Sequence, residues 1–302
     1  MKPIVNIGIL LIDKPEGLTS FEVVRRARRA LGVRKIGHLG TLDPFATGLL
    51  PLCLGEATKL APFLMGEPKT YRAVVKLGEE TDTQDLTGRV VAASEKMPTP
   101  EEVYEGAAGF VGEIEQVPPM YSALHHAGER LYKLARRGES VEVKPRKVTI
   151  HRLEVEEVRL PLVTIKVKCS QGTYIRTLAA DLGRALGCGG HLTALRRLAV
   201  GEFSVDAALP LSALEEMARE EIQALVIPLA QCLPGMLAAR VAPDEARRLR
   251  QGQALAWTGN HLPEGEPVKV LAGGDLVAVA QLRHREGKDW LAPLRVFSGS
   301  EQ

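Results

Sequence analysis

The chain contains the stretch Gly37-His38-Leu39-Gly40-Thr41-Leu42-Asp43-Pro44-Phe45-Ala46-Thr47-Gly48. Asp43 is the one acid in this loop, which glycines punctuate at 37, 40 and 48. Glycine permits backbone conformations closed to other residues and lets another segment approach closely. Proline fixes the φ angle directly after Asp43. We therefore expect a shaped loop that presents a single carboxylate. Asp-Pro is also an ordinary turn or helix-start dipeptide, so the loop alone leaves a purely structural role open.

The segments on the N-terminal side of this loop predict a strand and a helix. Residues 5–12 form an apolar run typical of a buried strand, and Thr19-Ser20-Phe21-Glu22 fits a capping box that opens a helix. We expect this helix to end at Leu31, before Gly32. Its apolar positions recur at helical spacing and predict a buried stripe of Phe21, Val24, Ala27 and Leu31.

Two further alternations predict half-buried strands at residues 70–77 and 163–169, the first with Tyr71 near its start. After Gly172, Thr173 is expected to cap a helix that ends at Gly187, which places Arg176 in its first turn. Strands and helices mix without regular β-α-β alternation. We therefore predict an α+β fold, with a catalytic domain on a mainly antiparallel mixed sheet flanked by helices.

A length of 302 residues favours two domains. Leu233-Pro234-Gly235 is the expected boundary, which gives domains at 1–234 and 235–302. Residues 243–250 predict a short helix, and the segments after it read as short strands separated by Gly, Pro and Asn. The second domain is therefore expected to be small and rich in β-strands.

The formal net charge of +2 conceals a strong segregation along the chain. It is +6 over residues 1–76, −8 over 77–118, +4 over 119–147 and 0 over 148–302. We interpret the third stretch as a basic inserted arm with a short helix. Its candidate RNA-binding residues are Arg130, Lys133, Arg136 and Arg137. This asymmetry is typical of a protein with one nucleic-acid face, although solvated helix faces are the alternative.

The cysteines and the apolar segments narrow the class of protein further. Four cysteines form no Cys-x-x-Cys pair, and the spacing Cys188 to His191 has no second ligand pair, so neither disulfides nor a zinc site is predicted. Residues 7–12 are too short for a signal-peptide core, and prolines interrupt the apolar stretch 224–239. We therefore expect a cytoplasmic protein with reduced thiols and no membrane segment.

The loop around Asp43 resembles the active-site motif of the TruB family of tRNA pseudouridine synthases, whose aspartate lies in Gly-His-x-Gly-x-Leu-Asp-Pro. The resemblance continues in order along the chain through Ala46-Thr47-Gly48-Leu49-Leu50-Pro51, Leu54-Gly55-Glu56-Ala57-Thr58-Lys59, Gly172-Thr173-Tyr174-Ile175-Arg176-Thr177 and Leu195-Arg196-Arg197-Leu198. Segments between 249 and 297 are similar to the PUA domain, an RNA-binding module.

The resemblance implies an enzyme that isomerises uridine to pseudouridine at position 55, in the TΨC arm of tRNA. Asp43 would be the nucleophile, Arg176 its ionic partner, and Tyr71 the residue that packs on the target base. His38 would stack in the RNA loop, in the gap that the flipped-out base leaves, and Leu195 would line the base pocket.

The resemblance also places Lys14 and Lys59 near the site, as supports or phosphate contacts. It further implies tRNA as the partner of a monomeric enzyme, without a guide RNA or an obligatory protein partner. The chemistry requires no metal and no organic cofactor, because an ionised aspartate can itself act as the nucleophile.

Two other interpretations remain open. The chain could be a tRNA-binding or tRNA-folding protein in which catalysis is secondary, or a two-domain protein in which Asp43 is only a turn residue. Ribosomal large-subunit pseudouridine synthases carry His-Arg-Leu-Asp where this chain has Gly-Thr-Leu-Asp-Pro, and guide-RNA-dependent relatives lack the long arm. The resemblance therefore favours a stand-alone tRNA enzyme.

Overall fold

The computed structural model describes residues 7–122, 124–126, 128–139 and 141–298. Its main body is built on a sheet of eleven strands, whose central order is β14-β1-β3-β12-β4-β11-β10-β7. Strands β2, β13 and β15 pair at the sides with β3, β12 and β1. In chain order these strands are β1 (Gly8–Lys14), β2 (Ile36–His38), β3 (Thr47–Leu54), β4 (Lys69–Leu77), β7 (Gly112–Gln116), β10 (Arg146–Arg159), β11 (Leu162–Cys169), β12 (Gly190–Val200), β13 (Phe203–Ser204), β14 (Leu209–Pro210) and β15 (Ile227–Pro228).

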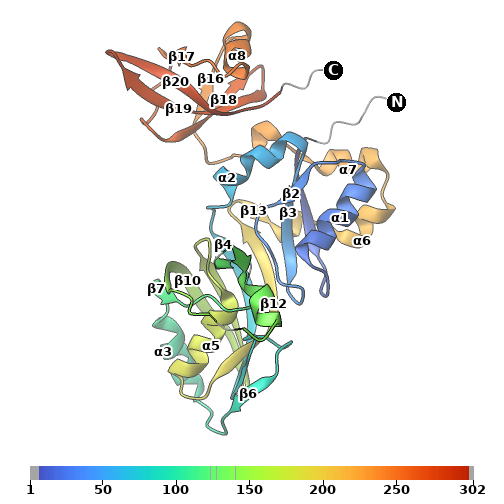
Figure 1. Ribbon diagram of the computed structural model, residues 1–302, viewed down its shortest axis with the longest axis vertical. Helices are drawn as coiled ribbons and strands as arrows, with labels where there is room; N and C mark the ends of the chain where they lie inside the picture. The colour runs from blue at the N-terminus through green and yellow to red at the C-terminus, as the bar shows by residue number, and fades with distance from the viewer. Residues whose placement is uncertain (1–6, 123, 127, 140, 299–302) are drawn as a thin grey trace.

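Helices cover this sheet in two groups, one at each end of the main body (Figure 1). One group comprises α1 (Ser20–Leu31), α6 (Leu211–Glu216) and α7 (Arg219–Leu225). The other comprises α3 (Pro100–Ala108) and α5 (Ile175–Ala185). Smaller elements are α2 (Ala61–Leu64), α4 (Leu131–Arg136) and the two hairpins β5–β6 (Glu79–Thr81 with Val90–Ala93) and β8–β9 (His125–His126 with Glu129–Arg130).

Two halves of the sheet meet where β3 pairs with β12. Most neighbouring strands are antiparallel, whereas β3 and β12 run parallel and pair only through Thr47 with Arg196 and Gly48 with Arg197. Each half packs on its own apolar cluster, one between the sheet and α5, the other between the sheet and α1. The predicted α+β fold on a mainly antiparallel mixed sheet is confirmed, and the loop that contains Asp43 lies directly before this junction.

The local rules behind the predicted elements hold in most places. Helix α1 begins after Thr19, whose side chain accepts a hydrogen bond from the Glu22 amide, and ends at Gly32 with φ +69°. The predicted burial of Phe21 is wrong: its relative exposure is 66%. The residues of α1 that face the sheet are Ser20, Val23, Val24, Ala27 and Leu31, and position 21 lies outside that stripe.

The predicted cap of α5 is also wrong. The helix begins at Ile175, and its N-cap Tyr174 makes no side-chain capping bond. Thr173 instead donates its hydroxyl to the Ser170 carbonyl at 3.0 Å, within the preceding turn. Arg176 nevertheless lies in the first turn of α5, as predicted.

The C-terminal part forms a second sheet of five strands in the order β16-β18-β19-β20-β17. Its elements are β16 (Ala238–Arg240), α8 (Pro243–Arg250), β17 (Leu255–Ala256), β18 (Pro267–Ala272), β19 (Asp275–Arg285) and β20 (Lys288–Val296). The predicted β-rich character and the helix at 243–250 are confirmed. Phe297, Val279 and Leu276 join Ile9 and Leu60 of the main body in one apolar cluster, so the two sheets are packed together.

Candidate active site

The loop that presents Asp43 depends on two glycines. Gly40 and Gly48 have φ angles of +95° and +99°, in the region that favours glycine. A Cβ atom on Gly48 would lie 2.3 Å from the Arg197 carbonyl oxygen, because β12 approaches the backbone closely there. The same expectation for Gly37 is wrong. It lies in β2 without a positive φ, and a Cβ there would meet Thr58 at an ordinary 3.7 Å.

Hydrogen bonds from both sides hold the backbone next to Asp43. The Ser20 hydroxyl accepts from the Leu42 amide at 2.8 Å and donates to the Leu42 carbonyl at 3.1 Å. The Pro44 carbonyl accepts from the Gly17 amide at 2.8 Å. The carboxylate is therefore presented by a loop whose backbone is fixed before and after it.

Arg197 of β12 completes this support from the core. Its side chain is almost fully buried, with Nε donating to the Leu49 carbonyl at 2.7 Å and Nη2 donating to the Gly40 carbonyl at 3.0 Å. The local sequence predicts no such role for Arg197. Two consecutive arginines in an alternating strand are the signal that was available, because one of the pair must point to the buried face.

Arg176 binds both oxygen atoms of the Asp43 carboxylate, with Nε 3.0 Å from Oδ2 and Nη2 3.4 Å from Oδ1. The Arg176 side chain is 4% exposed and that of Asp43 is 34% exposed. The pair therefore has a buried cation and a carboxylate that reaches the surface. Arg176 also donates to the carbonyls of Thr83 at 3.1 Å and Tyr121 at 2.8 Å, which fixes the guanidinium plane.

Asp85 is a second acid on the same guanidinium. Its Oδ2 lies 3.6 Å from Nη1 of Arg176, while its Oδ1 accepts from the Thr87 amide at 2.9 Å. The loop-capping character of Asp85 is visible in its sequence context, but its contact with Arg176 is not. The site therefore contains a chain of charges, Asp43–Arg176–Asp85, in which one cation faces two acids.

Burial raises the pKa of Asp43 above that of a free aspartate, and the nearby charge of Asp85 raises it further. Arg176 and Lys14 act in the opposite direction and favour the ionised form. Lys14 is itself fully buried, which lowers its pKa to about 8. Its ammonium donates to the carbonyls of Pro15 at 2.8 Å and Pro44 at 3.1 Å, so its contacts are those of a support for the loop.

Tyr71 and Leu195 lie in an apolar cluster together with Leu42, Phe45 and Ile175. The last three are close in sequence to Asp43 or to Arg176. Burial raises the pKa of Tyr71, although Arg197, which pairs with it across β12 and β4, lowers it. The phenol is therefore protonated near neutral pH. His38 is half-buried, and burial together with Arg197 lowers its pKa, so its imidazole is neutral there.

The remaining candidate residues are Lys59 and the cations of the arm. Lys59 is beyond the opposite end of β3, where it pairs with Glu56 and donates to the Val296 carbonyl at 3.0 Å, and the structure does not bring it to the site. In the arm, Arg130 and Lys133 are exposed, and Arg137 pairs with Glu129 at 2.7 Å and Glu139 at 2.6 Å. The side chain of Arg136 lies outside the described part of the structure.

This arrangement suits a reaction in which positive charge develops next to a carboxylate. A partly exposed Asp43, held at two points and lined by apolar and aromatic side chains, can attack an electrophilic carbon or stabilise a cationic one. Among the described residues, no group of three or more His, Cys, Asp or Glu side chains is placed to hold a metal ion.

The fold and this site define the class of protein. Residues 28–175 match the TruB family pseudouridylate synthase (N terminal domain), and residues 176–234 match the tRNA pseudouridylate synthase B C-terminal domain. The chain belongs to the TruB family of pseudouridine synthases.

Its relatives define the position within that family. The tRNA pseudouridine synthase B of Aromatoleum aromaticum is 50% identical over 293 residues, which cover 96% of this chain and 92% of that protein. The protein of the same name from Syntrophotalea carbinolica is 44% identical and covers 96% of this chain and 98% of its own length. The similarity therefore includes the C-terminal sheet.

Solved structures confirm the fold. A Cbf5-Nop10-Gar1 complex contains a chain with a TM-score of 0.77 and 25% identity, which covers 98% of this chain and 87% of that one. A chain in an H/ACA RNP bound to a substrate RNA containing 2'-deoxyuridine has the same TM-score and 23% identity. It covers 99% of this chain and 87% of its own length.

Among the helices in the described part of the chain, none is both long enough and apolar enough to cross a bilayer. All four cysteines are buried and free.

Proposed function

We propose that this chain converts uridine to pseudouridine at position 55 of tRNA, with Asp43 as the nucleophile and without a metal or organic cofactor. Pseudouridylation of tRNA is the activity named in relatives that align with nearly the whole chain. The observation that supports the role of Asp43 is its two-point contact with the buried Arg176 inside the apolar cluster of Tyr71 and Leu195.

The reaction moves a glycosidic bond without redox change. The bond from ribose C1′ to base N1 breaks and a bond from C1′ to C5 forms, while the proton on C5 is lost and N1 gains a proton. The ionised carboxylate of Asp43 can capture or stabilise the sugar while the detached base rotates. Arg176 keeps that carboxylate charged and oriented, because its guanidinium binds both oxygen atoms.

Tyr71, His38 and Leu195 are proposed to handle the base and the RNA loop. The buried phenol of Tyr71 can pack on the target base, and Leu195 can line the same space. A neutral, half-buried imidazole at His38 is suited to stacking in the gap left by a flipped base. Extraction of a base costs a few kcal/mol, which contacts elsewhere on the RNA must supply.

Exposed cations of the arm are the proposed source of part of that binding energy. Arg130 and Lys133 are exposed and can approach a phosphate backbone. Near the start of the arm, the Tyr121 carbonyl accepts a hydrogen bond from Arg176. We propose that the enzyme acts as a monomer in the cytoplasm on the T arm of tRNA, and that it needs neither a guide RNA nor a protein partner.

The decisive experiment is tritium release from an unmodified tRNA transcript labelled at uridine C5, with the modified position mapped by reverse transcription. Wild type is expected to release tritium from position 55 only, and Asp43→Asn is expected to release none while still binding tRNA. Binding without release in the wild type would instead favour a tRNA-folding protein. Unchanged release in Asp43→Asn would assign Asp43 to the turn alone.

A further inference from the structure

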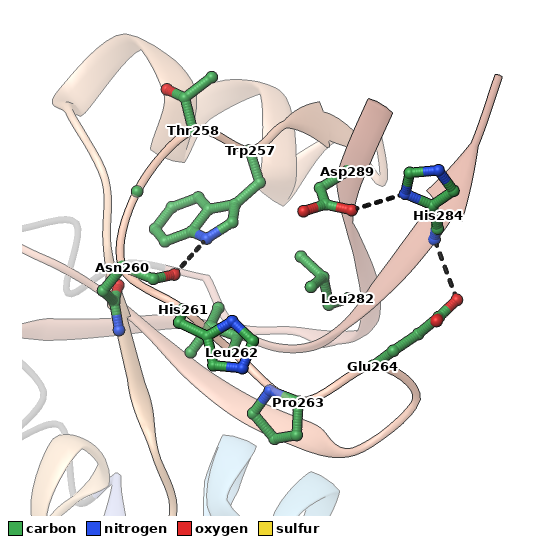
Figure 2. A pocket seen from close by; sticks show the side chains of 11 residues that line it. Trp257, Thr258, Asn260, His261, Leu262, Pro263, Glu264, Leu282, His284 and Asp289 are labelled. Atoms are coloured by element: carbon green, nitrogen blue, oxygen red, sulfur yellow. Dashed lines mark hydrogen bonds and ion pairs between the residues drawn. The ribbon is translucent and has the colours of Figure 1, made fainter. Parts of the chain in front are cut away.

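The C-terminal sheet contains a cavity of about 510 Å³ that the proposed reaction does not use. It lies between the loop 257–264, the end of β19 and the start of β20 (Figure 2). Its volume is in the range of small-molecule sites in proteins. Figure 2 shows Trp257 and His261 on one side, and Asp289, His284 and Glu264 on the other.

Trp257 forms a preorganised flat surface in this cavity. Its indole Nε1 donates to the Asn260 carbonyl at 2.9 Å, and its backbone amide donates to the Asp289 carbonyl at 2.8 Å. A Cβ atom on Gly259 would lie 2.4 Å from the indole, so the glycine lets the loop close against the ring. A ring fixed in this way can stack on a planar ligand with little further loss of side-chain freedom.

Two carboxylates, those of Asp289 and Glu264, provide hydrogen-bond acceptors in the cavity. Oδ1 of Asp289 lies 2.9 Å from Nδ1 of His284, within hydrogen-bond distance. Oε1 of Glu264 accepts a hydrogen bond from the His284 backbone amide at 3.2 Å. The second oxygen of each carboxylate has no partner among the described residues. No lysine or arginine lines the cavity, so its interior does not suit a phosphate group.

Cations lie on the same hairpin of β19 and β20 but on its other face. Arg283, Arg285 and Lys288 are exposed and alternate along the two strands with His284 and Asp289, which line the cavity. The fixed aromatic ring beside carboxylate oxygens therefore suits a planar base with N–H donors, and the cavity itself offers no cation to a phosphate.

We propose that this cavity binds one unpaired nucleobase of the RNA substrate, with guanine preferred, by stacking on Trp257 and donation of base N–H groups to Asp289 and Glu264. Guanine presents two adjacent donors, N1–H and the N2 amino group, on its Watson–Crick edge. Adenine and cytosine place an acceptor nitrogen beside their amino group, and uracil has one imino donor between two carbonyls. The inference rests on the proposed function, because it takes the substrate to be an RNA.

The test is equilibrium dialysis of the full-length protein against GMP, AMP, CMP and UMP separately. GMP is expected to bind at least about 10-fold more tightly than the other three, because one well-placed pair of hydrogen bonds gives discrimination of this order. Asp289→Asn and Trp257→Ala are expected to lose this preference, and Trp257→Phe to retain it. Glu286→Gln is the matched control, because Glu286 is exposed on the same hairpin and does not line the cavity.

Thermal unfolding of each variant separates loss of the site from loss of the fold. Equal binding of all four nucleotides, or displacement of GMP by inorganic phosphate, would overturn the proposal in favour of a phosphate site. Displacement by spermidine with no base preference would assign the cavity to organic cations, and absence of GMP binding would also overturn it. Tritium release from an isolated T-arm stem-loop is expected to be unchanged by Trp257→Ala, so the two proposals can fail independently.

Discussion

The surroundings of Asp43 act on the pKa of its carboxyl in opposite directions. Burial and the charge of Asp85 disfavour its ionised form, whereas Arg176 and Lys14 favour it. The net effect raises the pKa of the carboxyl, so the fold disfavours the ionised form that the proposed reaction needs.

Asp43→Asn is therefore expected to increase thermal stability at pH 7 while it abolishes tritium release. A carboxyl whose pKa is higher in the folded state than in the unfolded state costs stability above its folded pKa. It costs nothing below the unfolded value of about 3.9, where both states are protonated. The stability gain of the mutant should thus shrink as the pH falls from 7 to 4 in thermal unfolding scans. Asp275→Asn, at an exposed position, is the control. An Asp43→Asn variant that is less stable than wild type at pH 7 would contradict this account.

The proposed role of Asp43 predicts that the acid limb of the pH–rate profile depends on Arg176. Because this guanidinium lowers the pKa of Asp43, Arg176→Gln should move the acid limb to higher pH as well as slow the reaction. Single-turnover tritium release with excess enzyme, measured between pH 5 and 9, checks the shift. Arg184→Gln is the control, since Arg184 lies on the same helix but pairs at the surface with Asp181 and Glu80. An unchanged limb in Arg176→Gln would show that another group titrates.

The junction of β3 and β12 is the element that holds the loop of Asp43. At Gly48 a side chain would both adopt a φ of +99° and meet the Arg197 carbonyl at 2.3 Å. Gly48→Ala is therefore expected to lower the free energy of unfolding by more than about 2 kcal/mol.

Gly37→Ala is the matched control, because a Cβ there makes only an ordinary contact at 3.7 Å, and its cost should remain below about 1 kcal/mol. Urea unfolding of the two variants measures both values. Equal losses would mean that the parallel junction contributes no more to stability than the β2 strand.

The arm is the second element with a functional expectation. Arg130 and Lys133 are exposed and have no ion-pair partner among the described residues, whereas Arg137 already binds Glu129 and Glu139. Arg130→Ala or Lys133→Ala should reduce the salt dependence of tRNA binding by about one counterion each, and Arg137→Ala by less. Filter binding at several salt concentrations, in the Asp43→Asn background, measures these slopes. A larger effect at Arg137 would show that its ion pairs open when RNA binds.

In the whole molecule, the C-terminal sheet is joined to the main body by a shared core. Phe297 is fully buried in a cluster that contains Ile9, Cys53 and Leu60 of the main body. Lys59 lies over the Phe297 ring, 5.9 Å from its centre, and donates to the Val296 carbonyl. Lys59, which the family resemblance placed near the site, thus belongs to the interface between the two sheets.

Phe297→Ala should cost about 3–5 kcal/mol, because it removes a large apolar side chain from a close-packed interface. It should also separate the thermal unfolding of the two sheets into distinct transitions in scanning calorimetry. Leu237→Ala, at a position that is 53% exposed, is the control and should change the unfolding temperature little. A single transition in Phe297→Ala would show that other contacts maintain the coupling.

Local signals in the sequence were sufficient for the elements whose formation depends on neighbouring residues. The capped helix α1, the alternating strand β4 and the helix α8 follow from caps and periodicity, and all three are present. The carboxylate of Asp43 and its loop were also evident, since glycine spacing and the Asp-Pro pair are local features. Phe21 was misplaced because the orientation of a helix against the sheet is set by packing, not by its own periodicity.

The tertiary structure decided which distant residues meet. Arg176 lies 133 residues from Asp43, and Arg197 lies 148 residues from the Leu49 carbonyl that it binds. Such contacts depend on strand order and register, and no local pattern specifies them. For the same reason the roles of Arg197 and Asp85, and the position of Lys59 at the far end of β3, emerged only from the fold. The sequence determined the elements and the candidate acid, and the packing of the sheet determined the charges that surround it.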